Sequence, residues 1–299
     1  MTALLSTFTT LPFAQLRRNR YFYFYYDGFY ALLCVGAIAA CHLTGYTGII
    51  HDWRWEYLAI FPLFLYVGIL ANVFVHVCTH NSLPRPWNRL VGEICGMVVL
   101  TRFASWEVLH QRHHRYSDDV VRDPHPVDPS YLKFVLHHIT SLEPQLHQAV
   151  FDLYGDTPEN RRIEKIRSVV SFLTGLLLIT TWYTVLGTYA FLAFYLPGLV
   201  VGILHLVHFN WSTHNAFSPT RDFKPVNLNH GFYKIGNKLF FGIYMHANHH
   251  KRANVLNPAT VTPSLPITAP PTKAAILAAK VAREEASKAK PIDDLPKAA

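Results

Sequence analysis

Charged side chains are scarce in this sequence. Only 15% of its 299 residues are Asp, Glu, Lys or Arg, and 51% are hydrophobic, whereas a soluble domain carries roughly a quarter charged residues. The deficit is concentrated in three runs without any charge, residues 29–50, 57–75 and 168–209. Buried helices of soluble proteins rarely run past about 18 residues without a charge. A soluble all-α fold is therefore disfavoured, and the bilayer is the expected solvent.

Several metal and redox motifs are also missing. The four cysteines lie in or near apolar segments and form no CxxC pair: Cys34, Cys41, Cys78 and Cys95. Disulfides are therefore not expected. The chain has no HExxH motif of zinc proteases. It has one ExxH, from Glu107 to His110, where soluble carboxylate-bridged di-iron bundles use two, so that architecture is disfavoured as well.

The uncharged runs predict an all-α integral membrane fold with four transmembrane helices. A helix needs about 20 apolar residues to cross a hydrocarbon core of roughly 30 Å, so the third run is long enough for two passes with a tight turn at 186–189. The predicted spans are about 29–50, 57–80, 168–187 and 189–209. The stretch 90–100 is too short to cross and is expected on the membrane surface. Pro197-Gly198 is expected to kink or loosen the last span.

Basic residues predict the orientation. All but one of the 27 Lys and Arg residues lie before the first span, between spans two and three, or after span four; the exception is Arg54. Because positive loops stay in the cytoplasm, both termini and the long central loop are expected there. The net charge of +8 then suits anionic lipid headgroups and an acidic redox partner, and it requires no nucleic acid.

Composition divides the chain into three parts. Residues 1–28 are expected to form an interfacial segment with an aromatic belt at 21–26. Residues 29–257 are expected to form the membrane domain and a cytoplasmic helical cap. Residues 258–299, rich in Pro, Ala and Lys, are expected to form a flexible tail, of which 272–290 could be helical.

Histidines gather in three clusters, an HxxxH at the end of the second span and two HxxHH motifs. The clusters are His76/His80, His110/His113/His114 and His246/His249/His250. On a helix, positions i, i+3 and i+4 share one face, and all three clusters fall on the cytoplasmic side by the charge count. A single HxxxH is a weak signal. Three clusters in this order and on one side favour a metal site over a merely polar, His-rich loop.

This combination resembles the membrane fatty acid desaturase–hydroxylase superfamily over about residues 60–257. The NxxxH from Asn210 to His214 is similar to a motif of acyl-CoA desaturases, and the stretch 112–125 resembles the HHxxSD…DPH region of the family. The resemblance implies nine iron ligands, with Asn210 approaching the metal through water. The ligands would be His76, His80, His110, His113, His114, His214, His246, His249 and His250.

The resemblance also implies the cofactors, two iron ions with O2 as co-substrate. Nine imidazoles are more than one ion needs, but imidazole suits several transition metals, so iron rests on the resemblance. Other residues could hydrogen-bond the ligands, although each carboxylate could equally be a solvated loop charge, and the span histidines could bond between helices. These candidates are Glu107, Asp118, Asp119, Asp123, His125, His205 and His208.

The implied reaction is desaturation of a fatty acyl chain linked to a lipid, CoA or carrier protein, favoured by the Asn210/His214 pair. After the third cluster, residues 251–258 depart from the Phe-Pro sequel of long-chain desaturases, so chain length stays open. Hydroxylation, acetylene formation and decarboxylation to a terminal alkene are alternatives. Without an HPGG haem motif, the electrons are expected from a separate ferredoxin, rubredoxin or cytochrome b5-type donor. The non-enzymatic alternative is a His-rich membrane metal transporter, which would place ligands near the membrane midplane and often shows inverted repeats.

Overall fold

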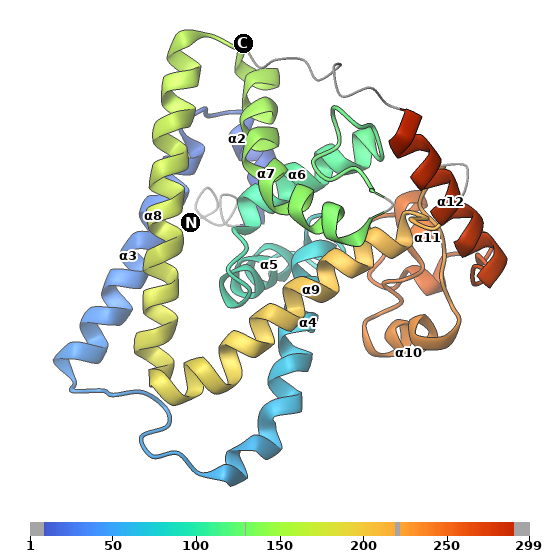
Figure 1. Ribbon diagram of the computed structural model, residues 1–299. Coiled ribbons are helices and arrows are strands. Elements are labelled where there is room, and N and C mark those ends of the chain that lie inside the picture. The colour runs from blue at the N-terminus through green and yellow to red at the C-terminus, as the bar shows by residue number, and fades with distance from the viewer. Residues whose placement is uncertain (1–8, 129, 219–221, 290–299) are drawn as a thin grey trace.

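The computed structural model describes residues 9–128, 130–218 and 222–289 (Figure 1). Within these ranges the secondary structure is helical, apart from isolated β-bridges of Asn227 with Met245 and Ile267. The helices are α2 Pro12–Leu16, α3 Phe22–Leu43, α4 Phe61–Cys78, α5 Trp87–Val98, α6 Phe103–Tyr116, α7 Tyr131–Tyr154, α8 Pro158–Ala190, α9 Leu196–Thr213, α10 Gly231–Leu239, α11 His246–Lys251 and α12 Lys273–Ala289. The predicted all-α class is confirmed.

Three helical segments of the described chain are long and apolar enough to cross a membrane: Phe22–Leu43, Trp55–Cys78 and Pro158–Thr213. The sequence predicts four spans, and the third segment, 56 residues long, covers the last two of them. That segment is sharply bent, because Gly187 has non-helical dihedral angles, φ 75° and ψ 167°. Figure 1 shows that α8 and α9 meet at this bend and that α9 runs obliquely back toward the other end of the molecule. The bend therefore falls in the predicted turn.

The helices begin earlier than the uncharged runs. Helix α3 starts at Phe22 rather than near residue 29, and α8 starts at Pro158 rather than near 168. The charged residues closest to the uncharged runs are buried and paired, so they do not end the helices: Asp27 accepts from Arg102 at 2.6 Å, and Arg167 lies 3.0 Å from Glu164. Several aromatic side chains expected in an interfacial belt instead pack between helices, including Tyr23 and Tyr26.

Close glycine contacts join α4 to α9. A Cβ atom on Gly68 would lie 2.1 Å from the backbone oxygen of Gly198, and one on Gly202 would lie 2.6 Å from that of Gly68. Small residues let helix backbones approach in this way. The predicted loosening near Pro197 takes the form of a π-helical turn at Phe191–Tyr195, directly before α9. The crossing brings together the ends of α4 and α9 that carry histidines.

Helices α5, α6, α7 and α11 form a cap over the histidine-bearing ends of α4 and α9 (Figure 1). Helix α5 covers the stretch expected on the membrane surface, and it exposes Trp87, Leu90 and Ile94 while Gly92 and Gly96 are buried. Helix α6 packs against α2, α5 and α7 and also contacts α4. The cap of α5, α6, α7 and α11 thus lies at one end of the helices that are long enough to span.

The packed part of the chain extends beyond residue 257, where composition predicts a tail. Asn248 on α11 donates to the Pro258 oxygen at 3.0 Å and accepts from the Leu265 amide at 2.8 Å. Val261 is buried. Residues 258–268 therefore brace the helix that carries the third histidine cluster, and α12 follows at Lys273.

Candidate metal centre

Four chain segments bring the predicted ligands together. His76 lies in the last turn of α4, and His80 follows that helix by two residues. The second cluster lies on α6, His214 caps the C-terminus of α9, and the third cluster lies on α11. The structure thus gathers all nine histidines that the sequence singles out, although their segments are separated by up to about 170 residues.

The ligand nitrogens form two groups of four. The first group is His80, His110, His114 and His249, and the second is His113, His214, His246 and His250. Within each group the nitrogens lie within 4.8 Å of one another. His76 forms a third group with His246 and His249 and so lies between the other two. Each group of four could hold one metal ion, so the arrangement suits two adjacent sites.

The rings of His113 and His214 provide a test of whether a cation fits. Their Nε2 atoms lie 3.2 Å apart. His113 Nδ1 lies 3.0 Å from both oxygens of Asp123, and His214 Nδ1 lies 3.0 Å from Asp118 Oδ2. A carboxylate at Nδ1 requires an N–H there, which leaves the Nε2 lone pair of each neutral ring free. Two lone pairs facing each other repel, and a cation between them removes the repulsion.

The other nitrogen pairs have the same spacing. The Nε2–Nε2 distances are 3.1–3.2 Å for His110–His114, His114–His249, His76–His249, His214–His246 and His246–His250. Metal–nitrogen bonds of about 2.1 Å meeting near a right angle would separate two nitrogens by about 3.0 Å. The donor set therefore fits transition-metal ions of the kind that imidazole prefers.

Burial keeps these imidazoles neutral, as metal ligands must be. It lowers the pKa of His80 to about 4 and that of His114 to about 2. Burial and the neighbouring imidazoles also lower the pKa of the other predicted ligands in the cap. Burial places the pKa well below 6.5 for His110, His113, His246, His249 and His250. The cluster thus offers lone pairs rather than positive charge at neutral pH.

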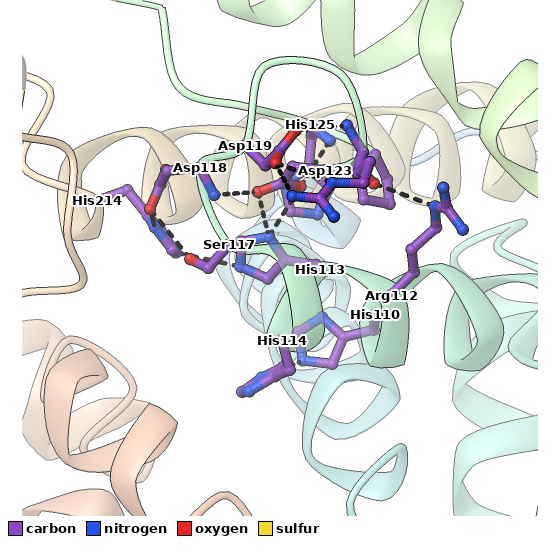
Figure 2. Close-up of polar contacts among 12 residues, drawn as sticks. His110, Arg112, His113, His114, Ser117, Asp118, Asp119, Asp123, His125 and His214 are labelled. Carbon is purple, nitrogen blue, oxygen red and sulfur yellow. Dashed lines mark hydrogen bonds and ion pairs between the residues drawn. The ribbon is translucent and has the colours of Figure 1, made fainter.

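The loop after α6 supplies the carboxylates that hold two of the rings (Figure 2). Asp118 adopts a left-handed conformation, φ 63°, and its amide donates to Asp123 Oδ2 at 2.6 Å. The His125 amide donates to the other oxygen of Asp123 at 3.0 Å. Two backbone amides therefore fix the carboxylate that binds His113. Non-glycine residues in this conformation are uncommon and gather at functional sites.

Asn210 lies one turn before His214 and is buried. Its Nδ2 atom has no hydrogen-bond partner in the described part of the chain. Buried polar atoms of this kind are usually satisfied by an ordered water or a ligand. The position suits an amide that reaches a metal through water.

Three other residues that the sequence suggested as hydrogen-bond partners of the ligands contact other residues instead. Glu107 accepts from the Phe13 amide of α2 at 2.7 Å, and burial raises the pKa of its carboxyl to about 8. Asp119 binds Arg122 at 2.6 Å. His205 lies 3.0 Å from the Tyr244 hydroxyl, which is a contact between helix α9 and the cap.

Two further histidines complete the prediction. His208 stacks on the ring of Tyr233, at 6.2 Å between centroids, and belongs to none of the ligand groups. The His125 ring lies 4.3 Å from that of His113, and with Asp123 these two rings form a further group that could hold a cation.

Trp106 was not singled out by the sequence. Its indole lies between the rings of His110 and His125, nearly parallel to both, at centroid distances of 5.7 and 6.2 Å. The sequence does contain a signal for this contact: Trp106 lies four residues before His110, which places both side chains on one face of α6. His138, expected at a surface, is instead buried beside His125.

Trp106 also lines a cavity of about 550 Å³. Its lining comes mainly from α6, α7 and α8 and combines apolar side chains such as Leu109 and Phe172 with polar ones such as Glu143. A second hollow of about 270 Å³, between α3 and α8, shares Leu100, Arg102 and Phe172 with the first. The first cavity thus lies one side chain away from the predicted ligand His110, on which Trp106 stacks.

Comparisons with known proteins identify a family. The family model described as fatty acid desaturase matches residues 53–260. An sn-1 oleoyl-lipid 12-desaturase of Picosynechococcus sp. is 28% identical over 184 residues, which cover 55% of this chain and 51% of that protein. An sn-1 oleoyl-lipid 12-desaturase of Synechocystis sp. is 36% identical over 97 residues, 31% of this chain and 26% of that protein. The chain thus spans about half the length, or less, of these curated relatives. No solved structure matches the chain.

Proposed function

Because this chain belongs to the fatty acid desaturase family, we propose that it is a multi-pass membrane oxidoreductase that uses two iron ions and O2 to place a double bond in a fatty acyl chain. The observation that carries the proposal is the pair of four-histidine groups, with His76 between them. The Nε2 atoms of His113 and His214 lie 3.2 Å apart, and each ring has a carboxylate at its Nδ1 atom, so two lone pairs face each other there. A bound cation would account for that arrangement better than a merely polar cluster.

In this proposal the protein's own residues bind the metal ions and orient the ligand rings. Attack on an unactivated methylene requires activated O2, and no side chain can activate O2. Two irons, when bound, would supply this chemistry. Asp123 and Asp118 keep His113 and His214 in the tautomer that presents Nε2 to the site. The amide of Asn210, whose Nδ2 atom has no partner within the described residues, would hold a water at the second four-histidine group.

The cavity beside Trp106 is evidence that the substrate is an acyl chain. The leucine and phenylalanine side chains in its lining can bury methylene groups, each worth roughly 0.8 kcal/mol, and its polar side chains, Arg102 and Glu143 among them, can face the polar end of a substrate. Because Trp106 stacks on His110, a chain lying in the cavity would bring its carbons up to the metal centre. Both cyanobacterial relatives act, by their names, on oleoyl-lipids, and a lipid-linked acyl chain is our first candidate for the substrate.

We further propose four membrane crossings, with the termini and the metal centre in the cytoplasm. The bend at Gly187 divides the third apolar segment into two helices that run in different directions. The exposed Arg54 lies in the connection between α3 and α4, opposite the histidine-bearing ends. The positive-inside rule then assigns the cap to the cytoplasm.

Expression in a host with simple lipids, followed by mass spectrometry of the fatty acids, tests the reaction. We expect a new double bond that depends on O2, and about two irons per purified chain. H249A should abolish the product while the protein stays in the membrane fraction. The matched control is H137A, because His137 is exposed on α7. Full activity of H249A, labile zinc in place of iron, or a hydroxylated or terminal-alkene product would overturn the proposal.

A further inference from the structure

Helix α6 has two chemically different faces. At 3.6 residues per turn, His113 and His114 lie within about 60° of His110 around the helix axis. Arg112, Arg115 and Tyr116 lie about 140–240° from His110, on the opposite side. Figure 2 accordingly shows the guanidinium of Arg112 on the other side of α6 from the rings of His113 and His114.

The second face gathers arginines around one aromatic ring. The guanidinium carbons of Arg112, Arg115 and Arg122 lie 5.2, 5.3 and 4.7 Å from the centre of the Tyr116 ring. Arg17 of the N-terminal segment lines the same region. We call this surface, made of Arg17, Arg112, Arg115, Tyr116 and Arg122, the arginine face.

The arginine face is hollowed and carries uncompensated charge. Two depressions of about 700 and 310 Å³ share Arg112, Arg115 and Tyr116 in their linings. Arg112 is paired with Asp152 and Arg122 with Asp119. Arg17 and Arg115 are exposed and form no ion pair within the described ranges. Two fixed positive charges therefore remain for a partner.

This surface faces away from the histidine-bearing ends of α4 and α9, and its Arg17 lies five residues before α3 begins. The histidine face of α6 meets ligands from the ends of α4 and α9, so the opposite face looks away from those ends. A lipid headgroup would be expected beside the spans. A soluble partner with negative charge fits the geometry better.

We propose that the arginine face is the docking surface for a small, acidic, one-electron carrier protein that reduces the metal centre. The inference rests on the proposed function, whose reaction consumes electrons. Converting –CH2–CH2– and O2 to –CH=CH– and two waters takes two electrons and two protons, so two reduced carriers must dock in turn. Electrostatic complementarity between a basic and an acidic surface speeds such encounters.

The helix also sets the distance for electron transfer. Arg112 and Arg115 flank the ligands His113 and His114 in the sequence. An α-helix with its side chains is about 10–12 Å across. A carrier seated on the arginine face would therefore lie about one helix diameter from the metal ligands, with no other element of the fold between them.

The test measures binding and turnover separately. The enzyme is placed in phosphatidylcholine vesicles, and the affinity of three acidic carriers is measured: a plant-type ferredoxin, a rubredoxin and a soluble cytochrome b5 domain. In the variant R17E/R115E the binding of the carrier preferred by the wild type should weaken about tenfold or more. The wild-type affinity should also fall as salt rises from about 0.02 to 0.3 M, because the Debye length shortens.

The control variant is K234E/K238E, which makes the same charge change at exposed positions of α10. It should bind the carrier like the wild type. Single-turnover product formation from dithionite-reduced enzyme should be unchanged in both variants, because that route bypasses docking. Absence of product there in the wild type is a failure of the proposed function and leaves the binding measurement in force.

Several results would overturn the docking site. They are binding of none of the three carriers by the wild type, equal weakening in both variants, or unchanged carrier affinity in R17E/R115E. An effect of R17E/R115E seen only when anionic phosphatidylglycerol is added to the vesicles would assign the face to lipid instead.

Discussion

Replacing Asp123 by asparagine should weaken one metal site and spare the other. The carboxylate of Asp123 accepts from the His113 ring at 3.0 Å, from the Asp118 amide at 2.6 Å and from the His125 amide at 3.0 Å. Asparagine keeps the shape but has one acceptor oxygen and one NH2 group. At least one of the three donors then faces another donor instead of an acceptor.

The size of the effect follows from that lost acceptor. A buried donor left without a partner costs about 1–3 kcal/mol. Removing a partner that orients a metal-binding imidazole usually costs about 10–100-fold in metal affinity, which is about 1.4–2.8 kcal/mol. The two estimates agree. Because His113 belongs only to the group with His214, His246 and His250 among the two four-histidine groups, the loss should fall on that site.

An anaerobic titration with ferrous iron against a competing chelator measures this directly. Wild-type enzyme should take up two ions, and D123N should need about 10–100 times more free iron to fill its second site. D119N is the matched control, since Asp119 lies in the same loop but binds Arg122 rather than a histidine. Equal weakening of both sites in D123N, or no weakening, would refute the reasoning.

Three further outcomes are expected. G68A should disrupt the α4–α9 crossing and lower the yield of folded protein in detergent by size exclusion, because its Cβ would lie 2.1 Å from a backbone oxygen; G175A, with nothing within 4 Å, should fold normally. L142W should fill the cavity beside the metal centre and raise KM for the acyl substrate without changing iron content. L132W, at an exposed position of α7, should leave both KM and iron content unchanged. E107Q should leave stability unchanged near pH 5 and raise it near pH 9. Burial raises the pKa of Glu107 to about 8, so the wild type loses stability, by up to a few kcal/mol, as pH rises from about 4.5 through 8. A difference in melting temperature between E107Q and wild type that does not grow with pH would contradict this.

The three histidine clusters could be found in the sequence because most of their members obey helical spacing, and the resemblance added His214. Helical spacing places rings on one face of a helix, and the structure brings the three clusters together. The helix starts could not be read in the same way. Asp27 and Arg167 look like ends of apolar runs, yet each is itself buried and has a partner of opposite charge. A buried pair permits a charge inside a helix that composition alone would end.

The supporting carboxylates show where local spacing misleads. Glu107, one turn before His110, suits contact with the cluster by spacing, but it faces α2 and holds the Phe13 amide. Asp123, ten residues after His113, reaches that ring because the loop reverses at Asp118. Aspartate tolerates the left-handed conformation better than most residues, but nothing in the linear sequence specifies that the chain turns there. The choice between these carboxylates is made by tertiary structure.

The distribution of charge around α6 links the metal site to the arginine face. Metal cations and guanidinium groups repel, and at 4 Å a pair of unit charges costs about 1–4 kcal/mol, depending on the local dielectric constant. Across the helix, at about 11 Å, the same pair costs about 0.4–1.5 kcal/mol, and salt screens the exposed side further. Asp118 and Asp123 lie on the metal side of the helix, against His214 and His113. Helical periodicity therefore lets one short segment hold cations on one face and attract an anionic protein to the other.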